Sequence, residues 1–375
     1  MEPLIETLSE LISINSINPE WGGPGESGVA DFVETFLENA EIESWREEVL
    51  PGRSNVMGRI AGKDSNRAVL LEAHMDTVSV AGMTIPPFSP EVLDGKLYGR
   101  GSCDTKAGLA GMMHALAAVE KPPCDVYLLA VIDEEHAFRG VLGALDWLEK
   151  RGVKAEAAIV AEPTELKVIR CNKGVLRWQI ETRGIVAHSS KPHLGRNAIA
   201  TMARVIVELE KFHEVLADRT HPLVGAATCN IGLIKGGAQV NFVPEECVIT
   251  LDRRMLPRET AKSVISEYEE VLRDFPDDEV IIHPPMLSDE AMEIAADSPV
   301  TLCASSVLSA MGLDAEPRGV PFGCDCTKLS RAGIPSLIFG PGSIDQAHTA
   351  AEFVDIDHVE LAFDFYRRFL LEYGA

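Results

Sequence analysis

Six side chains that can bind a metal ion stand at or shortly after the ends of apolar runs in this sequence. They are His74, Asp104, Glu134, Glu135, Glu162 and His348. His74 follows the run AVLLEA, the acids 133–135 follow DVYLLAVI, and Glu162 follows AAIVA. Acidic residues that end a buried strand are costly unless positive charge lies nearby. The pattern therefore predicts a cation site with nitrogen and oxygen ligands.

The segments around His74 and Asp104 offer two parts of such a site. Asp76 is two residues after His74, so both side chains can share one face and Asp76 can bind the second ring nitrogen of His74. In the Gly-rich turn YGRGSCDTKAG, the small neighbours of Asp104 permit close approach to a cation. The alternative for Asp104 is the N-cap of the following helix. A dinucleotide fingerprint is weak here, because Asp104 occupies its third glycine position.

The ligand types predict two divalent cations, with zinc favoured and cobalt or manganese as alternatives. As ligands, Asp104, Glu135 and Glu162 would bring three negative charges and a bridging hydroxide a fourth, which balances two divalent cations. Such a pair activates the bridging water and polarises an amide carbonyl. Glu134 then has no ligand role, so we expect it to act as general base and then as general acid toward the leaving amine.

The elements that must position these residues alternate between apolar runs and helical patterns up to about residue 170. The predicted strands are residues 68–73, 125–132 and 157–161, and the predicted helices are residues 108–120 and 140–150. Alternation of this kind predicts an α/β fold with a mainly parallel central sheet. The candidate ligands would then gather at the carboxyl edge of that sheet.

From Gly174 the pattern changes to β-α-β-β-α-β, the order of a small ferredoxin-like α+β sandwich. The predicted strands are 174–184, 227–237, 247–254 and 279–284, and the predicted helices are 197–212 and 259–273. The α/β pattern resumes with a helix at 298–312 and a strand at 336–340. We therefore predict a catalytic domain of residues 1–172 and 287–375, interrupted by an inserted domain of residues 173–286.

The composition limits the partners and the compartment. The formal net charge of −24 repels nucleic acid and anionic membranes and favours a small-molecule or peptide partner. The start of the chain has no signal-peptide pattern, and no apolar stretch approaches the length of a membrane span. Eight cysteines without framework spacing predict reduced thiols in the cytoplasm. Cys324 and Cys326 flank Asp325 but lack the second pair that a thiolate zinc site needs.

Together the motifs resemble the metallo-aminoacylase and carboxypeptidase family that includes acetylornithine deacetylase, succinyl-diaminopimelate desuccinylase and carboxypeptidase G. Over essentially the whole chain the matching motifs are HMDTV (74–78), GRGSCDTKAG (99–108), DEE (133–135), AEPT (161–164), GIVAHSS (184–190) and QAH (346–348). The resemblance implies a zinc-peptidase-like catalytic domain with an inserted lid domain. Thr105-Lys106-Ala107 departs from the family's usual Met-Lys-Gly, but the Asp-x-Lys frame is retained.

The resemblance also implies a role for each residue of the cluster. The implied ligands are His74, Asp104 and Glu162 for one metal, and Asp104, Glu135 and His348 for the second. Asp104 would thus bridge the two metals, Asp76 would orient His74, and Glu134 would be the general acid and base. A cis peptide bond between Asp104 and Thr105 is implied as well.

In the resembling family, the inserted domain is a lid that also forms the homodimer. His188 in GIVAHSS matches a histidine that reaches across the dimer to stabilise the tetrahedral oxyanion. Asn241 and Arg254 match substrate-binding residues, with Arg254 pairing with the α-carboxylate as a bidentate fork. Gly323 matches a glycine of the substrate-binding turn. The alternative to a substrate-binding role for Arg254 is that of a solvated arginine on a strand. The adjacent Arg253 is the better candidate for that solvated role.

The motif GPGSIDQAH (340–348) is most similar to acetylornithine deacetylase. We therefore predict an amino-acid biosynthetic hydrolase of linear amides that removes the acyl group from a small N-acyl amino acid. Desuccinylation, or broad aminoacylase or carboxypeptidase activity on dipeptides, remains as an alternative. A non-catalytic amino-acid or peptide-binding protein on the same scaffold would be expected to lack a ligand or Glu134, and all are present.

Overall fold

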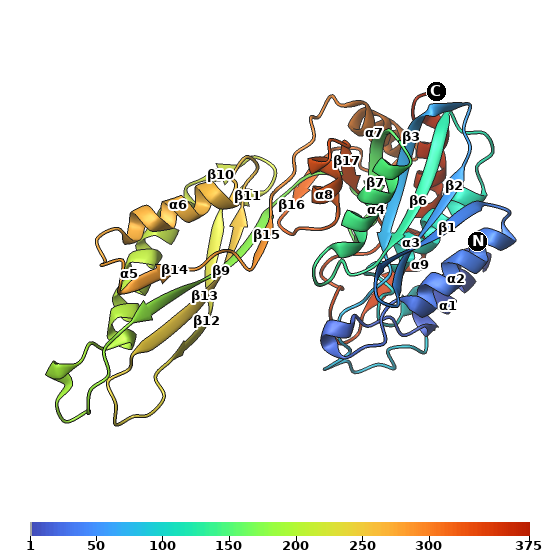
Figure 1. Cartoon of the computed structure of the whole chain (residues 1–375). Coiled ribbons are helices and arrows are strands. Elements are labelled where there is room, and N and C mark those ends of the chain that lie inside the picture. The colour runs from blue at the N-terminus through green and yellow to red at the C-terminus, as the bar shows by residue number, and fades with distance from the viewer. Residues whose placement is uncertain (1) are drawn as a thin grey trace. The chain divides into compact units, whose positions relative to one another are not determined.

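The computed structural model describes residues 2–375 as two compact units (Figure 1). The first unit comprises the chain through Arg170, with Ile294–Arg318 and Cys324–Ala375. The second unit comprises Cys171–Glu293 and Gly319–Gly323. Within the described residues, no helix is both long and apolar enough to span a membrane.

The first unit is built on an eight-stranded sheet with the order β1-β2-β6-β3-β7-β17-β8-β16. Its strands are β1 (Glu43–Leu50), β2 (Arg53–Ile60), β3 (Asp64–His74), β6 (Cys124–Val131), β7 (Ala155–Val160), β17 (Ser336–Ile338), and β8 (Ile169–Asn172) and β16 (Arg318–Val320), which run into the second unit. The helices are α1 (Glu2–Ser13), α2 (Ser27–Asn39), α3 (Lys106–Ala117), α4 (Arg139–Lys150), α7 (Pro299–Ala310), α8 (Cys326–Arg331) and α9 (Ile356–Glu372). A separate small sheet pairs β18 (Phe353–Asp355), β5 (Lys96–Tyr98) and β4 (Glu91–Leu93).

The centre of the large sheet is parallel, which confirms the predicted fold class. β6, β3, β7 and β17 are neighbours that all run in the same direction. All of β6, and β3 from Ala68 to its end, are buried. Continuous burial without alternation means that both faces of these strands are covered. α3 packs against β3, β6 and α9, whereas α4 and α8 form a second group of contacting helices (Figure 1).

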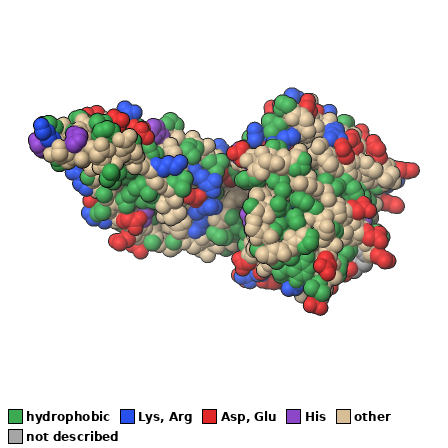
Figure 2. Space-filling model, turned by 90° about the horizontal axis from the view of Figure 1, so that it is seen from below, with side chains coloured by type: hydrophobic (Ala, Val, Ile, Leu, Met, Phe, Trp, Pro, Cys, Tyr) green, Lys and Arg blue, Asp and Glu red, His purple; other side chains and the backbone are tan. Residues whose placement is uncertain are grey.

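Two antiparallel additions to this sheet were not predicted. The hairpin β1–β2 extends one side of the parallel centre, and β8 pairs antiparallel with β17 on the other. Acidic side chains are frequent at the periphery of the first unit (Figure 2), as the net charge of −24 leads one to expect.

The second unit has the predicted β-α-β-β-α-β order. Its elements are β9 (Gly174–Arg183), α5 (Ala198–Ala217), β12 (Thr228–Gly236), β13 (Glu246–Met255), α6 (Ala261–Leu272) and β14 (Val280–Ile282). The unpredicted additions are a 3-10 turn at Pro192–Leu194, the short pair β10 (Thr220–His221) and β11 (Gly225–Ala226), and β15 (Leu287–Asp289). The sheet order is β12-β13-β9-β14, antiparallel throughout.

The second unit has one apolar core, which lies between its sheet and the helices α5 and α6. Alternate residues of β9 and β13 are buried, and with α5 and α6 they form one apolar cluster. At its centre the rings of Trp178 and Tyr268 meet edge to face, with centroids 4.7 Å apart. Such a pair adds about 0.5–1.5 kcal/mol beyond the burial of its area.

Candidate metal centre and active site

The parallel strands bring four of the predicted residues to one edge of the first unit's sheet. His74 is the last residue of β3, Glu134 and Glu135 follow the end of β6, and Glu162 follows the end of β7. Because these three strands are adjacent and parallel, their carboxyl ends meet. His348 lies in the loop between β17 and β18.

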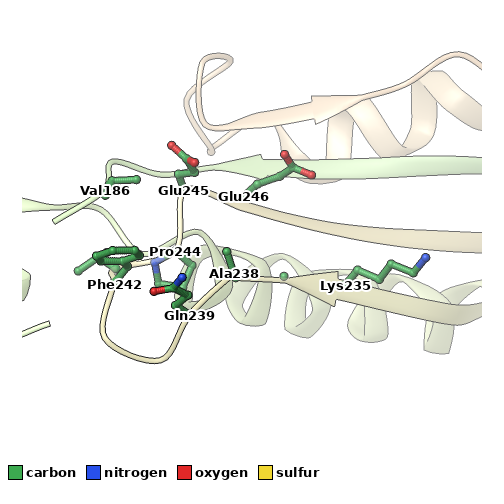
Figure 3. Close-up of a pocket in the computed structure, with 11 residues that line it drawn as sticks. Val186, Lys235, Ala238, Gln239, Phe242, Pro244, Glu245 and Glu246 are labelled. Carbon is green, nitrogen blue, oxygen red and sulfur yellow. The ribbon is translucent and has the colours of Figure 1, made fainter. Parts of the chain in front are cut away.

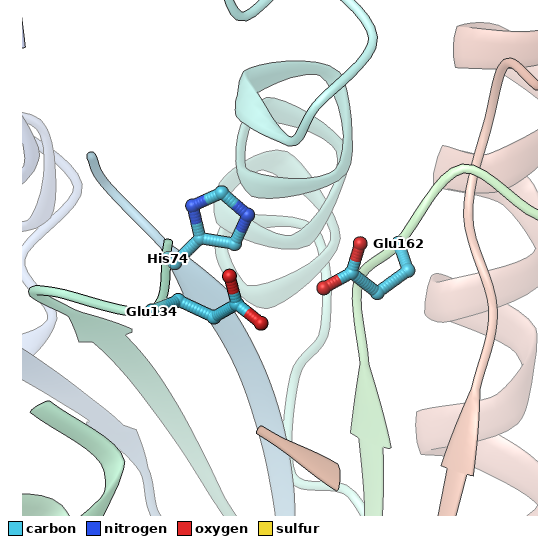
Figure 4. Close-up of side chains that lie close together, drawn as sticks. All are labelled: His74, Glu134 and Glu162. Atoms are coloured by element: carbon cyan, nitrogen blue, oxygen red, sulfur yellow. The ribbon is translucent and has the colours of Figure 1, made fainter. Parts of the chain in front are cut away.

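Two groups of side chains have ligand atoms close enough to share a cation. One group is His74, Glu134 and Glu162, whose side chains face one another (Figure 4). The other is His74, Asp104 and Glu135. Within each group the ligand atoms all lie within 4.8 Å of one another. Glu134 is thus close enough to bind a cation, although the sequence predicts a proton-transfer role for it.

Asp104 lies between the two histidines of the cluster. Its Oδ1 is 3.1 Å from His74 Nε2, and its Oδ2 is 3.2 Å from His348 Nε2. His348 Nε2 is also 3.0 Å from Glu135 Oε1. One carboxylate that reaches both histidines has the geometry of a bridging ligand. The peptide bond between Asp104 and Thr105 is cis, as the resemblance implies.

The alternative role of Asp104 as a helix cap is wrong. α3 begins at Lys106 with Thr105 at the N-cap position, and no side chain caps this end. The carboxylate of Asp104 instead turns into the cluster, where the two histidines bind both of its oxygens. Asp104 therefore lies just before the start of α3, but its carboxylate contacts the histidines of the cluster and does not cap the helix.

Burial and charge perturb the titration of the whole cluster. Burial raises the pKa of Glu135 to about 7, and it raises the pKa of Glu134 and Glu162 well above their ordinary value. At Asp104, burial acts to raise the pKa, but hydrogen bonds with the histidines outweigh it and lower the pKa. Hydrogen bonds with Asp104 and Glu135 raise the pKa of His348 to about 10.

These residues fit two divalent cations. Buried carboxylates whose ionised form is disfavoured indicate an excess of negative charge that bound cations would offset. The donors are imidazole nitrogens and carboxylate oxygens, which suit zinc, cobalt and manganese. None of the candidate groups among residues 2–375 includes Cys324 or Cys326, and all eight cysteines are free thiols.

Asp76 contacts both sides of the cluster. His74 Nδ1 is 3.0 Å from the main-chain oxygen of Asp76 and 3.6 Å from its carboxylate, so the main chain makes the shorter contact. The carboxylate accepts hydrogen bonds from the main-chain N–H groups of Glu134 (3.1 Å) and Glu135 (3.2 Å). Asp76 therefore also fixes the turn that carries the two glutamates, a role that the spacing of His74 and Asp76 did not predict.

Asn18 is a residue of the site that the sequence did not reveal. Its side-chain amide donates to Asp76 Oδ2 (2.8 Å) and to Asp133 Oδ1 (3.0 Å), and it is fully buried. It thereby supports the carboxylate that holds the turn of Glu134. Asn18 lies in an N-terminal loop far from every motif, so no local pattern could identify it.

A second pair of buried carboxyl groups adjoins the cluster. Glu72 precedes His74 by two residues, and it interacts with Asp325 next to the start of α8. Burial raises the pKa of Asp325 to about 7 and raises the pKa of Glu72 well above its ordinary value. The segment around Asp325 thus contributes a buried acid beside the cluster.

His188 and Asn241 come together in the second unit. They lie in the two loops that follow β9 and β12, where His188 pairs with Phe242 and the N–H of Ser189 donates to the main-chain oxygen of Asn241 (3.0 Å). Both side chains are exposed. His188 Nδ1 is 2.8 Å from the Ser190 hydroxyl. We call the loops of residues 184–195 and 237–245 the loop tip.

Arg254 lies near the opposite end of the same sheet. It pairs in register with Val175 and Thr228, and its Nε donates to Asp252 Oδ1 (2.8 Å). Gly323 lies at this end as well, where an added Cβ would be 3.5 Å from Val175 Cγ2. From Glu246 to Arg254 the strand β13 spans roughly 26 Å, at about 3.3 Å per residue. One chain's loop tip and Arg254 are therefore too far apart to contact the same small molecule.

The expectation that Arg253 is the solvated arginine is wrong. Its side chain is 0% exposed, and its guanidinium donates to both carboxylate oxygens of Glu259 (2.8 and 3.0 Å). Strand periodicity gives the reason, because β13 turns Arg253 toward the helix-covered face and Arg254 toward the other. The accessible arginine is therefore Arg254.

Comparison with known proteins places these features in a family. The profile of Peptidase family M20/M25/M40 matches residues 70–372. An acetylornithine deacetylase from Myxococcus xanthus is 30% identical over 365 residues, which cover 94% of this chain and 92% of that protein. An N-formyl-4-amino-5-aminomethyl-2-methylpyrimidine deformylase from Bacillus subtilis is 27% identical over 407 aligned residues, which cover 96% of this chain and 91% of that protein.

Solved structures share the fold along the whole chain. A tripeptidase from Staphylococcus aureus has a TM-score of 0.81 at 20% identity, with 100% of this chain and 98% of that chain covered. A metallo-carboxypeptidase from Sulfolobus solfataricus has a TM-score of 0.77 at 20% identity, with both chains fully covered. A dinuclear metal-binding peptidase from Bacillus subtilis has a TM-score of 0.74 at 17% identity, over 99% of this chain and 98% of that chain.

The sheet-edge cluster and these likenesses define a metal-dependent hydrolase of the zinc-peptidase type of fold. The profile match covers most of the sequence, and the Myxococcus relative extends over nearly all of it. The chain belongs to the M20/M25/M40 peptidase family.

Proposed function

We propose that this protein is a dinuclear metal amidohydrolase that removes the acyl group from a small N-acyl amino acid, with N-acetylornithine as the preferred substrate. The observation that carries the proposal is Asp104 between His74 and His348, with Glu134 beside it. The acetylornithine deacetylase at 30% identity supports the choice of substrate. Zinc is the proposed metal, the cytoplasm the proposed location, and amino-acid biosynthesis the proposed process.

The residues of the cluster would divide the work between binding and proton transfer. The proposed ligands are His74, Asp104 and Glu162 for one metal, and Asp104, Glu135 and His348 for the other. The metals would supply an activated water and a polarised amide carbonyl. Glu134 would accept the proton and deliver it to the leaving amine, and burial raises its pKa above the ordinary value of a glutamate, which favours its holding a proton. Asp76 would keep Glu134 in place through its main-chain N–H.

The second unit would bind the rest of the substrate. We assign Arg254 and Gly323 to the substrate carboxylate and its surroundings, and His188 and Asn241 to the acyl group and its developing charge. Because β13 separates Arg254 from the loop tip by roughly 26 Å, one chain cannot supply all four to one site. This separation supports a site in which His188 and Asn241 come from the partner subunit of a homodimer.

The surface of the second unit supports such a dimer. β12 is the edge strand of its sheet, and Leu233 and Ile234 on it are largely exposed. Beside it, a cavity of about 290 Å³ is lined by residues of the loop tip that include Val186 and Phe242 (Figure 3). An exposed apolar edge strand is a ready template for pairing with a second copy.

The test is a comparison of substrates with metal-loaded protein. Assays of kcat/KM should use N-acetylornithine, N-succinyl-diaminopimelate, N-acetylmethionine and a dipeptide, and we expect N-acetylornithine to give the highest value. A higher value for the succinyl compound or the dipeptide would move the assignment to a desuccinylase or a carboxypeptidase. An N-formyl amine belongs in the set, because the deformylase relative favours formyl removal as a second candidate. No hydrolysis of any amide would contradict the proposal.

A further inference from the structure

Glu352 is a buried carboxylate that no sequence motif singled out. It follows His348 by four residues, directly precedes β18, and is 0% exposed. It belongs to neither candidate group of metal ligands. A buried carboxylate is costly unless its oxygens are well paired, so its partners indicate what it does.

All the partners of Glu352 lie in the turn that carries Asp104. Its Oε2 accepts from Arg100 Nη1 (2.6 Å) and from the N–H of Gly101 (3.0 Å). Its Oε1 accepts from the N–H groups of Cys103 (2.9 Å) and Asp104 (3.0 Å). One carboxylate therefore binds three main-chain amides and one guanidinium of residues 100–104.

The main chain of Glu352 completes this attachment. Its carbonyl oxygen accepts from the N–H of Gly99 (3.1 Å), and the pairing of β18 with β5 places Phe353 opposite Tyr98. The segment that follows His348 is thus attached to the turn of residues 99–104 through both the side chain and the main chain of Glu352, and to β5 through Phe353. Asp104 Oδ2 is 3.2 Å from His348 Nε2. Glu352 binds the main chain of Asp104 and lies four residues after His348, so it links the two segments that carry these side chains.

We propose that Glu352 is a positioning residue for the metal centre, which fixes the bridging carboxylate of Asp104 relative to His348. Its loss lowers the affinity for divalent cations, whereas the loss of a buried carboxylate elsewhere in the fold lowers only the melting temperature. The inference rests on the proposed two-metal function. Glu352 touches no cation itself and acts only through the turn and the loop that it joins. Groups that orient metal ligands commonly change metal affinity by about 10- to 100-fold when they are replaced.

A purely structural carboxylate offers the matched control. Asp125 at the start of β6 is also buried, and it accepts from Arg59 Nε (2.9 Å) and from the N–H of Gly62 (2.8 Å). It lies at the opposite end of β6 from Glu134. Replacement of either acid by its amide removes a buried charge that binds a guanidinium and at least one main-chain N–H group, but only Glu352 contacts the turn that carries Asp104.

The experiment compares metal-free wild type, Glu352→Gln, Glu352→Asp and Asp125→Asn. Titration with Zn²⁺ and with Co²⁺ by calorimetry gives the affinities, the visible spectrum of the Co²⁺ forms reports ligand geometry, and the melting temperature reports the fold. We expect Glu352→Gln to weaken cation binding at least about tenfold and to alter the Co²⁺ spectrum. Asp125→Asn should lower the melting temperature while its cation affinity stays within about twofold of wild type.

The variants also separate positioning from structure. Glu352→Asp keeps the charge but is too short to reach all four donors, so its affinity should lie between wild type and Glu352→Gln. If Glu352→Gln does not fold, the weaker binding of Glu352→Asp carries the test. Wild-type affinity in a folded Glu352 variant, or an equal loss in Asp125→Asn, would overturn this inference alone. If wild type binds no divalent cation, the proposed function fails first and the inference with it.

Discussion

The carboxyl edge of the first unit's sheet and the loop tip of the second unit differ in how far their polar side chains are buried and in what those side chains contact. His74, Asp104 and Glu162 are buried, and the atoms of the cluster contact one another within the unit. His188 and Asn241 are exposed, and the imidazole of His188 forms its hydrogen bond with Ser190 of its own loop. The first arrangement is preorganised for cations in a low-dielectric surrounding, where electrostatic interactions are strong. The second leaves both side chains accessible to solvent.

The largest effect is expected when divalent cations are removed from the cluster at the sheet edge of the first unit. Dialysis of the protein against a chelator should abolish amide hydrolysis, and added Zn²⁺ or Co²⁺ should restore it, because the cations would activate the attacking water. Elemental analysis of the reloaded protein should show up to two divalent ions per chain. Absence of binding at neutral pH after zinc is supplied would contradict the dinuclear assignment.

The adjacent acids Glu134 and Glu135 test the division of labour inside the cluster. Glu134→Gln should lower kcat by about 10²- to 10⁴-fold while the metal content stays near that of wild type, because it removes the proton carrier. Glu135→Gln should instead lower the metal content. Metal analysis and steady-state kinetics of both variants check this. Swapped phenotypes would mean that the two roles are reversed.

Replacement of His188 tests the second region. His188→Ala should lower kcat by about 10²- to 10³-fold, which is the usual cost of one lost oxyanion donor, while metal binding is unchanged. The matched control is His193→Ala, in the same loop and also exposed. Equal losses in the two variants would indicate a general effect of the loop.

Mixing of two inactive proteins sharpens the comparison between the regions. His188→Ala and Glu134→Gln subunits, once exchanged, should form heterodimers in which one site combines the intact Glu134 of one chain with the intact His188 of the other. Activity should rise to about half a wild-type site per chain in these heterodimers. If native mass spectrometry confirms exchange and no activity returns, His188 does not act across the dimer.

The smallest expected effect is the pH dependence of cation binding. In the metal-free protein burial raises the pKa of Glu135 to about 7, so the acid holds a proton below that pH and must release it to bind a cation. His348, whose pKa is raised to about 10, must release a proton as well. Affinity should therefore fall as the pH drops below 10, and more steeply below 7, by up to about tenfold per pH unit for each linked proton. Calorimetry in two buffers of different ionisation enthalpy measures the released protons. Affinity that is independent of pH between 6 and 8 would contradict this linkage.

Much of the first unit could be predicted because buried parallel strands have a strong local signature. The apolar runs that end at His74, before Glu134 and before Glu162 identify β3, β6 and β7, and their carboxyl ends locate the cluster. The hairpin β1–β2 was missed, because β1 has only exposed and half-buried residues, and in β2 the buried Val56 and Met57 stand between Asn55 and Gly58, so neither strand gives a continuous apolar run. Arg253 was misjudged because one residue of register decides whether a strand side chain faces helices or solvent.

The sequence by itself determined the residue types of the site, their places at strand ends, the parallel strands that carry them and the β-α-β-β-α-β order of the second unit, because each leaves a local pattern of hydrophobicity. Only the tertiary structure decided that β3 lies between β6 and β7, that Asn18 holds Asp76, and that Glu352 holds the turn of Asp104. These contacts join segments 58 and 248 residues apart. They depend on how separate elements pack, and neither burial nor a shifted pKa exists until that packing has excluded water.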